Sequence, residues 1–88
     1  MDTSGRIREF ITKNFYVPDP AELTDDGSLL DRGIIDSTGV MELIGFLEET
    51  FGFKVEDAEM IPENLDGIGR VVAYVERKVE QKKGNAGK

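Results

Sequence analysis

The 88-residue sequence contains no cysteine, no histidine and no tryptophan. Without cysteine the chain has no disulfide and no thiol nucleophile, and without histidine it lacks the side chain best suited to proton transfer near neutral pH. A zinc site of the usual kind is excluded for the same reason. The composition therefore argues against autonomous catalysis and against a metal centre.

Long apolar segments are also missing. The longest uninterrupted apolar run, Val71 to Val75, is far too short to cross a bilayer. The first ten residues lack the charged-then-apolar order of a secretion signal. We therefore expect a cytoplasmic protein that does not insert into membranes.

The size of the chain limits it to one small domain, because 9.8 kDa leaves room for a single hydrophobic core. Hydrophobic residues make up 39% and charged residues 33%, as in a globular chain with little apolar surface to bury. We expect one domain over residues 1–88, ordered from about residue 4 to residue 80. The tail 81–88 has no apolar anchor and is expected to be disordered.

The formal net charge of −7 is unevenly distributed. Residues 18–69 carry fourteen acidic and two basic groups, whereas residues 70–88 carry two acidic and six basic groups. An acidic middle segment repels phosphate backbones and attracts partners with basic surfaces. We expect a monomer that does not bind nucleic acid, although the acids would also be explained by solubility alone.

Three segments carry apolar residues at helical spacing. The first begins at Thr3 or Ser4 as the cap and ends near Val17, because two prolines follow. The strongest spans residues 37–51 and is followed by Gly52, and the last begins near Leu65. The apolar residues of the three stripes are Ile7, Phe10, Ile11 and Phe15, then Val40, Leu43, Ile44, Leu47 and Phe51, then Ile68, Val71, Val72, Val75 and Val79.

The remaining segments are a long loop and a short helical turn. Residues 19–36 mix Pro, Asp, Gly and Ser with two apolar pairs that pin the loop to the core, Leu29 with Leu30 and Ile34 with Ile35. Residues 56–60 form a short helix before Pro62, with Ala58 and Ile61 inward. The fold class is all-α: a four-helix bundle with a long first loop and a short third helix.

Small residues suggest where a cleft would lie. Gly45, Ala58 and Met60 leave space between the last three helices, which places a cleft there. Gly39 and Gly45 also weaken the helix over residues 37–51, so either something packs closely against them or tertiary contacts sustain the helix.

Ser37 is the polar residue of greatest interest, because it begins the strongest helix. A hydroxyl there lies beside unsatisfied backbone N–H groups and the positive end of the helix dipole, which favours a bound or attached phosphate. The alternative is that Asp36 or Ser37 simply caps the helix.

Other chemistry finds no support in the sequence. Ser37 has neither a histidine base nor a Gly-x-Ser-x-Gly frame, which excludes a serine hydrolase. The acidic residues of the loop lack the alternating ligands and terminal Glu of a calcium loop. A phosphate-cradling glycine motif with its lysine is also missing.

The wider pattern resembles the acyl carrier protein family. The run LDRGIIDS over residues 30–37 is followed by Glu42-Leu43 and by LEETFG over residues 47–52. Residues 55–57 and the PENLDGI of residues 62–68 resemble the short third helix of that family and the entry to its fourth. The resemblance extends from about Ile7 to Val79.

This resemblance implies that Ser37 is the attachment point of a 4′-phosphopantetheine arm, transferred from coenzyme A by a separate phosphopantetheinyl transferase. Asp36 would serve recognition by that transferase. The arm would carry an acyl or aminoacyl group as a thioester between a loading ligase and downstream acyltransferases, and the chain itself would not be an enzyme. Partner enzymes would dock on the exposed side of the second helix, at Thr38, Met41, Glu42, Glu48 and Glu49.

The form IDSTG over residues 35–39 is similar to stand-alone carriers, including D-alanyl carriers as well as fatty acyl carriers. Many carriers have Leu where this chain has Thr38. Peptidyl carriers usually have a Gly-Gly pair before the serine, which the GII of residues 33–35 does not match. The alternative function is an unmodified module of the same fold that docks through its acidic second helix.

Overall fold

The computed structural model describes residues 2–17, 19 and 23–86, and the side chains as far as Gln81. Its elements are α1 (Thr3–Asn14), α2 (Ser37–Phe51), the 3₁₀ turn η2 (Asp57–Glu59), α3 (Pro62–Leu65) and α4 (Ile68–Ala86). The described part of the chain contains no strand. The all-α architecture with a long first loop and a short third helix is thus confirmed. The position expected for the short helix, residues 56–60, is wrong, because only a 3₁₀ turn forms there and α3 begins at Pro62, which is favourable in the first turn of a helix.

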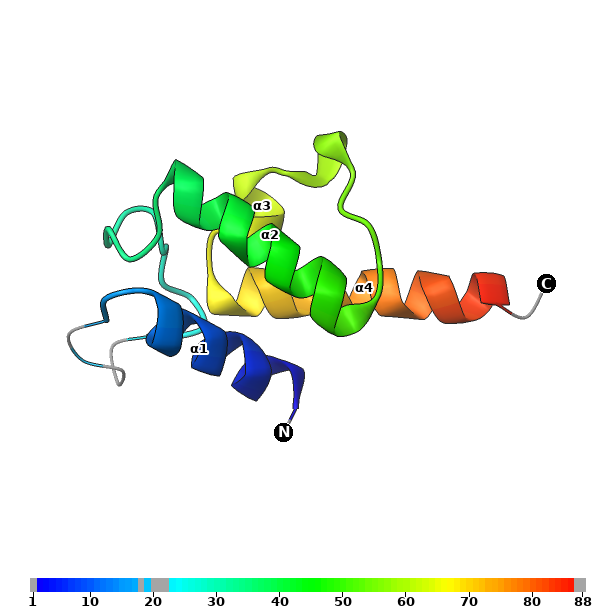
Figure 1. Ribbon diagram of the computed structural model, residues 1–88, viewed down its shortest axis with the longest axis horizontal. Helices are drawn as coiled ribbons and strands as arrows, with labels where there is room; N and C mark the ends of the chain where they lie inside the picture. The colour runs from blue at the N-terminus through cyan, green and yellow to red at the C-terminus, as the bar shows by residue number, and fades with distance from the viewer. Residues whose placement is uncertain (1, 18, 20–22, 87–88) are drawn as a thin grey trace.

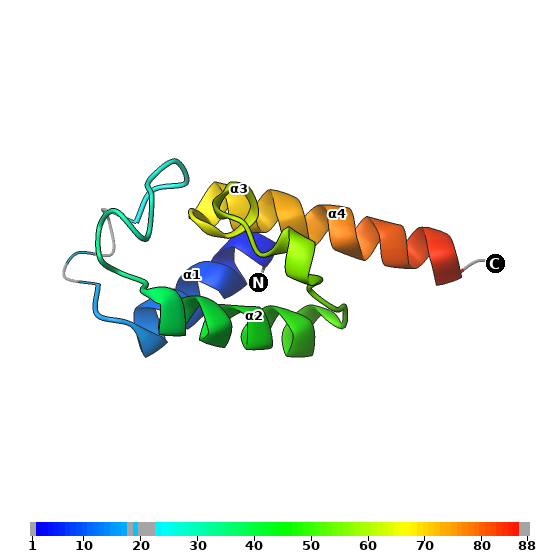
Figure 2. The ribbon, with the colours of Figure 1, turned by 90° about the horizontal axis from the view of Figure 1, so that it is seen from above.

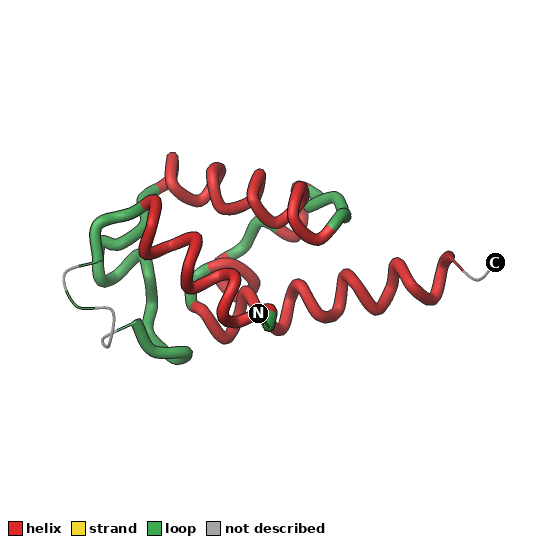
Figure 3. Tube along the Cα trace, turned by 60° about the horizontal axis from the view of Figure 1, so that its bottom comes forward, coloured by secondary structure: helices red, strands yellow, loops and turns green. Residues whose placement is uncertain are grey.

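The three long helices surround the core, and α3 packs against the start of α4 (Figures 1 and 2). The molecule measures 46 × 27 × 20 Å along its principal axes. The long dimension arises because the C-terminal half of α4 extends past the other helices (Figure 3). Within the described residues no helix is both long and apolar enough to cross a membrane.

Helix α1 begins one residue earlier than expected. The carboxylate of Asp2 accepts a hydrogen bond from the Gly5 N–H at 2.7 Å, so Asp2 is the cap in place of Thr3 or Ser4. A carboxylate accepts this bond as well as a hydroxyl does and also interacts favourably with the helix dipole. The helix ends at Asn14, short of Tyr16 and Val17.

Helix α2 has the bounds expected from the sequence. Asp36 caps its start, and Gly52 ends it with φ 74° and ψ 36°, a left-handed conformation that glycine adopts without steric cost. Because both ends are fixed by local chemistry, Ser37 is the first residue of the helix.

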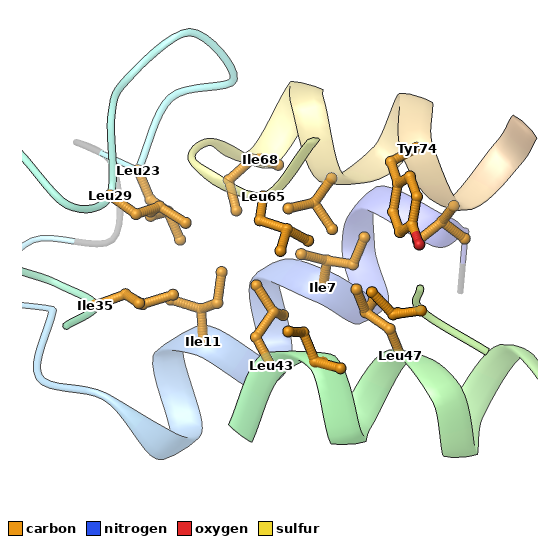
Figure 4. Packing of buried hydrophobic residues seen from close by; sticks show 14 of the residues in the cluster. Ile7, Ile11, Leu23, Leu29, Ile35, Leu43, Leu47, Leu65, Ile68 and Tyr74 are labelled. Atoms are coloured by element: carbon orange, nitrogen blue, oxygen red, sulfur yellow. The ribbon is translucent and has the colours of Figure 1, made fainter. Parts of the chain in front are cut away.

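The hydrophobic core is contributed by all the long helices and by the loops (Figure 4). Ile7 and Ile11 of α1 meet Leu43 and Leu47 of α2, with the ring of Tyr74 from α4 at one end. The other buried hydrophobic residues are Leu23, Leu29, Ile35, Ile44, Phe53, Val55, Leu65, Ile68, Val71 and Val75. The expected inward positions of Ala58 and Ile61 are wrong, because both residues are exposed.

The loop between α1 and α2 is pinned to the core, but by only part of the expected residues. Leu29 and Ile35 are buried, whereas Leu30 is exposed. Asp66 binds the loop from the other side, since its carboxylate accepts from the Leu30 N–H at 2.8 Å and from the Ser28 hydroxyl. Residues 18 and 20–22 lie outside the described residues.

Helix α4 continues to Ala86, past the residue 80 at which we expected order to end. Adding a residue to a helix that is already nucleated forms one hydrogen bond per residue fixed, so helix can persist without an apolar anchor. Of the expected tail, residues 87–88 lie outside the described residues.

Candidate functional site

The start of α2 places a cap and a free hydroxyl side by side. The Gly39 N–H donates to Asp36 Oδ1 at 2.7 Å, so Asp36 is the capping residue. Ser37 follows as the first helical residue, and it is exposed to solvent. Among the described residues none hydrogen-bonds the Ser37 hydroxyl, which is therefore free to react or to bind.

Backbone donors remain available around this hydroxyl. The cap satisfies the N–H of Gly39, and the Val40 N–H donates to the Asp36 carbonyl at 2.9 Å. The N–H groups of Ser37 and Thr38 are left without an acceptor in the helix, as the first donors of any helix are. An anionic group attached at Ser37 Oγ would lie next to these donors and the positive end of the helix dipole.

An apolar cleft of about 310 Å³ adjoins Ser37. One wall is the first half of α2, the opposite wall is the segment from Met60 to Leu65, and the loop before α2 also lines the cleft. Its lining residues are Leu29, Leu30, Ile35, Ser37, Val40, Met41, Ile44, Met60, Ile61, Pro62, Leu65 and Asp66. Ten of these twelve are hydrophobic, so the cleft suits an apolar group tethered nearby.

The cleft is not where small residues had suggested. Met60 lines it, but Gly45 and Ala58 do not, and no residue of α4 does. A small residue leaves space inside a bundle only when it faces inward, and both Gly45 and Ala58 face solvent. The cleft instead runs from the start of α2 to the start of α3.

Close packing fixes the position of the α2 terminus. A Cβ atom on Gly39 would lie 2.7 Å from the Phe15 ring, a separation that real side chains do not adopt. Gly45, by contrast, has no atom within 4 Å of where its Cβ would lie. Close packing therefore explains Gly39, and nothing in the structure explains Gly45.

The expected docking residues divide into two kinds. Thr38, Met41, Glu42 and Glu49 are exposed along α2, and Met41 has 58% of its surface accessible. Glu48 is half-buried, and its Oε2 accepts from the Val55 N–H at 2.9 Å. Glu48 therefore holds the segment after α2 in addition to contributing charge.

Two site residues were missed in the sequence. Leu30 and Ile61 are exposed hydrophobic residues that line the cleft together with Met41. In the sequence, Leu30 is an apolar residue next to another in the loop, and Ile61 is an apolar residue just before Pro62. A single sequence does not tell which apolar residues of these segments face the cleft.

The site contains no group placed to activate its own serine. The chain has no histidine, and Oδ1 of the adjacent Asp36 is engaged by the Gly39 N–H. Across residues 2–17, 19 and 23–86, no three acidic side chains converge on a point that could hold a metal ion. Any covalent change at Ser37 Oγ therefore needs a base from outside the chain.

Comparison with known proteins agrees with this geometry. The family model described as "Phosphopantetheine attachment site" matches residues 5–75. The D-alanyl carrier protein of Abiotrophia defectiva is 41% identical over 54 residues, which cover 61% of this chain and 68% of that protein. The acyl carrier protein of Thermotoga maritima is 30% identical over 75 residues, or 85% of this chain and 89% of that protein. The D-alanyl carrier protein of Streptococcus pyogenes serotype M1 is 36% identical over 61 residues, with 69% and 76% covered.

Proposed function

The chain belongs to the family defined by the phosphopantetheine attachment site, and on that premise we propose that Ser37 carries the 4′-phosphopantetheine arm. Proteins of this family are carriers and not catalysts. The arm supplies a thiol on which an acyl or aminoacyl group is held as a thioester. A chain without cysteine has no thiol of its own, so the imported sulfur is the only one available for this purpose.

The observation that carries the proposal is the free hydroxyl of Ser37 at the first residue of α2. It is exposed, so a transferase can reach it, and it adjoins an apolar cleft in which a tethered group can lie. The donors of Ser37 and Thr38 favour the phosphodiester, whereas the carboxylate of Asp36 opposes it by charge repulsion. The backbone donors at the start of α2 therefore fit the phosphate of the arm, and the apolar cleft fits the group that the arm carries.

In the modification step, Ser37 Oγ gives its proton to a base of the transferase and forms a new bond to phosphorus. The bond that breaks joins that phosphate to the adenosine bisphosphate half of coenzyme A, which leaves. Asp36 contributes in two ways: it fixes the helix start through its bond to the Gly39 N–H, and it offers its exposed second oxygen for recognition by the transferase.

Partner enzymes are proposed to dock on the exposed stripe of α2. Carriers of this family work with a phosphopantetheinyl transferase and with enzymes that load the arm. Glu42 and Glu49 would meet basic groups of these enzymes, and Thr38 and Met41 would make contact nearer to Ser37, in the first turns of α2. Met41 suits several partners because its side chain repacks easily. Glu48 adds its charge to this stripe while it holds Val55.

Acyl and aminoacyl groups are the two candidate cargo classes. The relatives are named for both, since the protein from T. maritima is an acyl carrier and that from A. defectiva a D-alanyl carrier. The apolar lining of the cleft favours an acyl group with an apolar chain.

The test is the intact mass after incubation with coenzyme A and a broad-specificity phosphopantetheinyl transferase. Wild type is expected to gain one phosphopantetheine, and Ser37→Ala none. Thr12→Ala is the matched control, because it removes an exposed hydroxyl on α1 and leaves Ser37 and the proposed docking residues of α2 in place. An unchanged wild type would contradict the proposal and favour an unmodified docking module.

A further inference from the structure

The two walls of the cleft are held in different ways. The wall formed by α2 is a helix of 15 residues with a cap at each end. The opposite wall belongs to a segment built from a three-residue turn, η2, and a four-residue helix, α3. Elements this short have few internal hydrogen bonds, so their position depends on bonds to the rest of the molecule.

Glu59, directly before the wall residue Met60, makes several of these bonds. Its Oε1 accepts from the Tyr74 hydroxyl at 3.0 Å and from Lys78 Nζ at 3.0 Å. The Glu56 N–H donates to the same oxygen at 3.0 Å. We call Glu59, Tyr74 and Lys78 the Glu59 clasp, because together they join η2 to α4.

A second set of bonds reinforces the clasp. The carbonyl of Glu59 accepts from the Asn64 side chain at 2.9 Å, and Arg77 of α4 donates to the Asn64 oxygen at 2.8 Å. Hydrogen bonds thus attach the wall segment to α4 at Glu59 and at Asn64, and the cleft separates the segment from the first half of α2.

The clasp is partly shielded from water, which distinguishes it from a fully exposed surface ion pair. Tyr74 is 1% exposed, and the side chains of Lys78 and Glu59 are 16% and 29% exposed. Hydrogen bonds to a charged group in such surroundings are stronger than those between neutral groups in water. The backbone N–H of Glu56, aided by Lys78 and Tyr74, lowers the pKa of Glu59, so its carboxylate is ionised at neutral pH.

We propose that Glu59 is a positioning residue that keeps the cleft beside Ser37 preformed for an apolar acyl group, by holding the Met60–Leu65 wall against α4. The part of this inference that concerns the acyl group rests on the proposed function. A wall that is already in place does not have to become ordered when the group enters, so no ordering entropy is lost at that step. The preformed wall therefore shelters the group more fully than a loose segment would.

The first experiment uses the unmodified protein, so it does not depend on the arm. Amide hydrogen exchange is compared between wild type, Glu59→Gln, Tyr74→Phe and the control Glu63→Gln. Glu63 lies in the same segment, is exposed and loses the same charge. Glu59→Gln should speed exchange over residues 59–65 about tenfold relative to the α2 core, because bonds to a charged group are lost. Tyr74→Phe should act in the same direction but more weakly, and Glu63→Gln should have no effect.

A uniform rise in exchange over α1, α2 and α4 would overturn the inference, because Glu59 would then only contribute to global stability. An unchanged segment in both Glu59→Gln and Tyr74→Phe would overturn it as well. Tyr74→Phe keeps the buried ring, so it reports on the clasp even if Glu59→Gln does not fold.

The second experiment loads the arm with an acetyl or an octanoyl group and measures cleavage of each thioester by hydroxylamine. In Glu59→Gln the octanoyl thioester should be cleaved several-fold faster than in wild type, which is the order of change expected from the loss of one such hydrogen bond. The acetyl thioester should be cleaved at an unchanged rate. Equal acceleration of both would show that Glu59 acts on the arm or the whole fold, which overturns the inference. If Ser37 takes up no arm, the proposed function fails, while the exchange experiment still decides whether the clasp holds the wall.

Discussion

Single glycines in α2 have opposite structural roles. Gly39 gives the Phe15 ring room to pack at the helix start, where a Cβ would lie 2.7 Å from the ring. Gly45 lies six residues further on, with open space around it. The same substitution at the two positions separates tertiary packing from helix propensity.

Gly39→Ala should therefore destabilise the protein by about 1–3 kcal/mol, because overpacking outweighs the better helix propensity of alanine. Gly45→Ala should stabilise it by about 1 kcal/mol, since the helix gains propensity and nothing is displaced. Urea unfolding followed by circular dichroism measures both. Stabilisation by Gly39→Ala would contradict the packing argument at the α2 terminus.

The Glu59 clasp makes a pH-dependent contribution at the residue scale. The pKa of Glu59 is below its ordinary value of 4.5, chiefly because the Glu56 N–H donates to it. A group with a lowered pKa in the folded state stabilises that state above the unfolded pKa, and this stability is lost as the pH falls through the folded pKa.

The stability difference between wild type and Glu59→Gln should thus be full at neutral pH and shrink below about pH 4.5. Urea unfolding at several pH values measures it, with Glu63→Gln as the charge-matched control. A difference that stays constant down to strongly acidic pH would show that the ionised carboxylate is not the stabilising form.

Elements were predictable from the sequence where local chemistry fixes them. Helix α2 has a capping residue, a regular apolar stripe and a terminal glycine, and its bounds were predicted correctly. The core residues that were missed lie outside such stripes. Leu23 is alone in a loop, Phe53 and Val55 alternate in a short extended segment, and Tyr74 lies beside the main stripe of α4.

The position of Ser37 at the start of α2 was predictable, whereas the position of the cleft was much less so. The serine follows from its place at a helix start and from the resemblance of the surrounding residues to carriers. The cleft depends on how α2 and α3 face each other, which is a tertiary property. Small residues such as Gly45 and Ala58 were therefore misleading, because the fold turns them toward solvent.

The acidic side of α2 provides a prediction at the element scale. Glu49 is exposed, whereas Glu48 also accepts from the Val55 N–H. If α2 docks on basic groups of a phosphopantetheinyl transferase, as proposed, Glu49→Lys should slow association with that enzyme, mainly at low salt, and leave stability nearly unchanged. Glu48→Lys should slow association too and also destabilise the protein by about 1–3 kcal/mol, because a half-buried N–H loses its acceptor.

Stopped-flow association at two ionic strengths, together with urea unfolding, measures these effects. Glu9→Lys on α1 is a suitable control for the change of charge, since it lies on another helix. An association rate that responds neither to Glu49→Lys nor to salt would contradict docking through this side of α2.

At the scale of the whole molecule, the excess of negative charge acts against folding. The chain carries −7 overall, and fourteen of its acidic groups fall within residues 18–69. Such charges repel one another more in the compact state than in the unfolded chain, and salt screens this repulsion.

The midpoint of thermal unfolding should therefore rise between about 0.02 and 0.2 M sodium chloride, because the screening length shortens to about 10 Å or less at the higher concentration. Circular dichroism during heating measures the midpoint. A fall with added salt would mean that the ion pairs Arg8–Asp25 and Lys78–Glu59 outweigh the net repulsion.

The projecting end of α4 lies at the opposite pole of the molecule from the start of α2, as all three ribbon and tube views show (Figures 1 to 3). A fluorophore or a biosensor linkage joined beyond α4 would stand clear of Ser37 by much of the 46 Å length. Immobilisation through the end of α4 would therefore leave the exposed Ser37 hydroxyl away from the surface, which suits surface-based tests of the proposed modification.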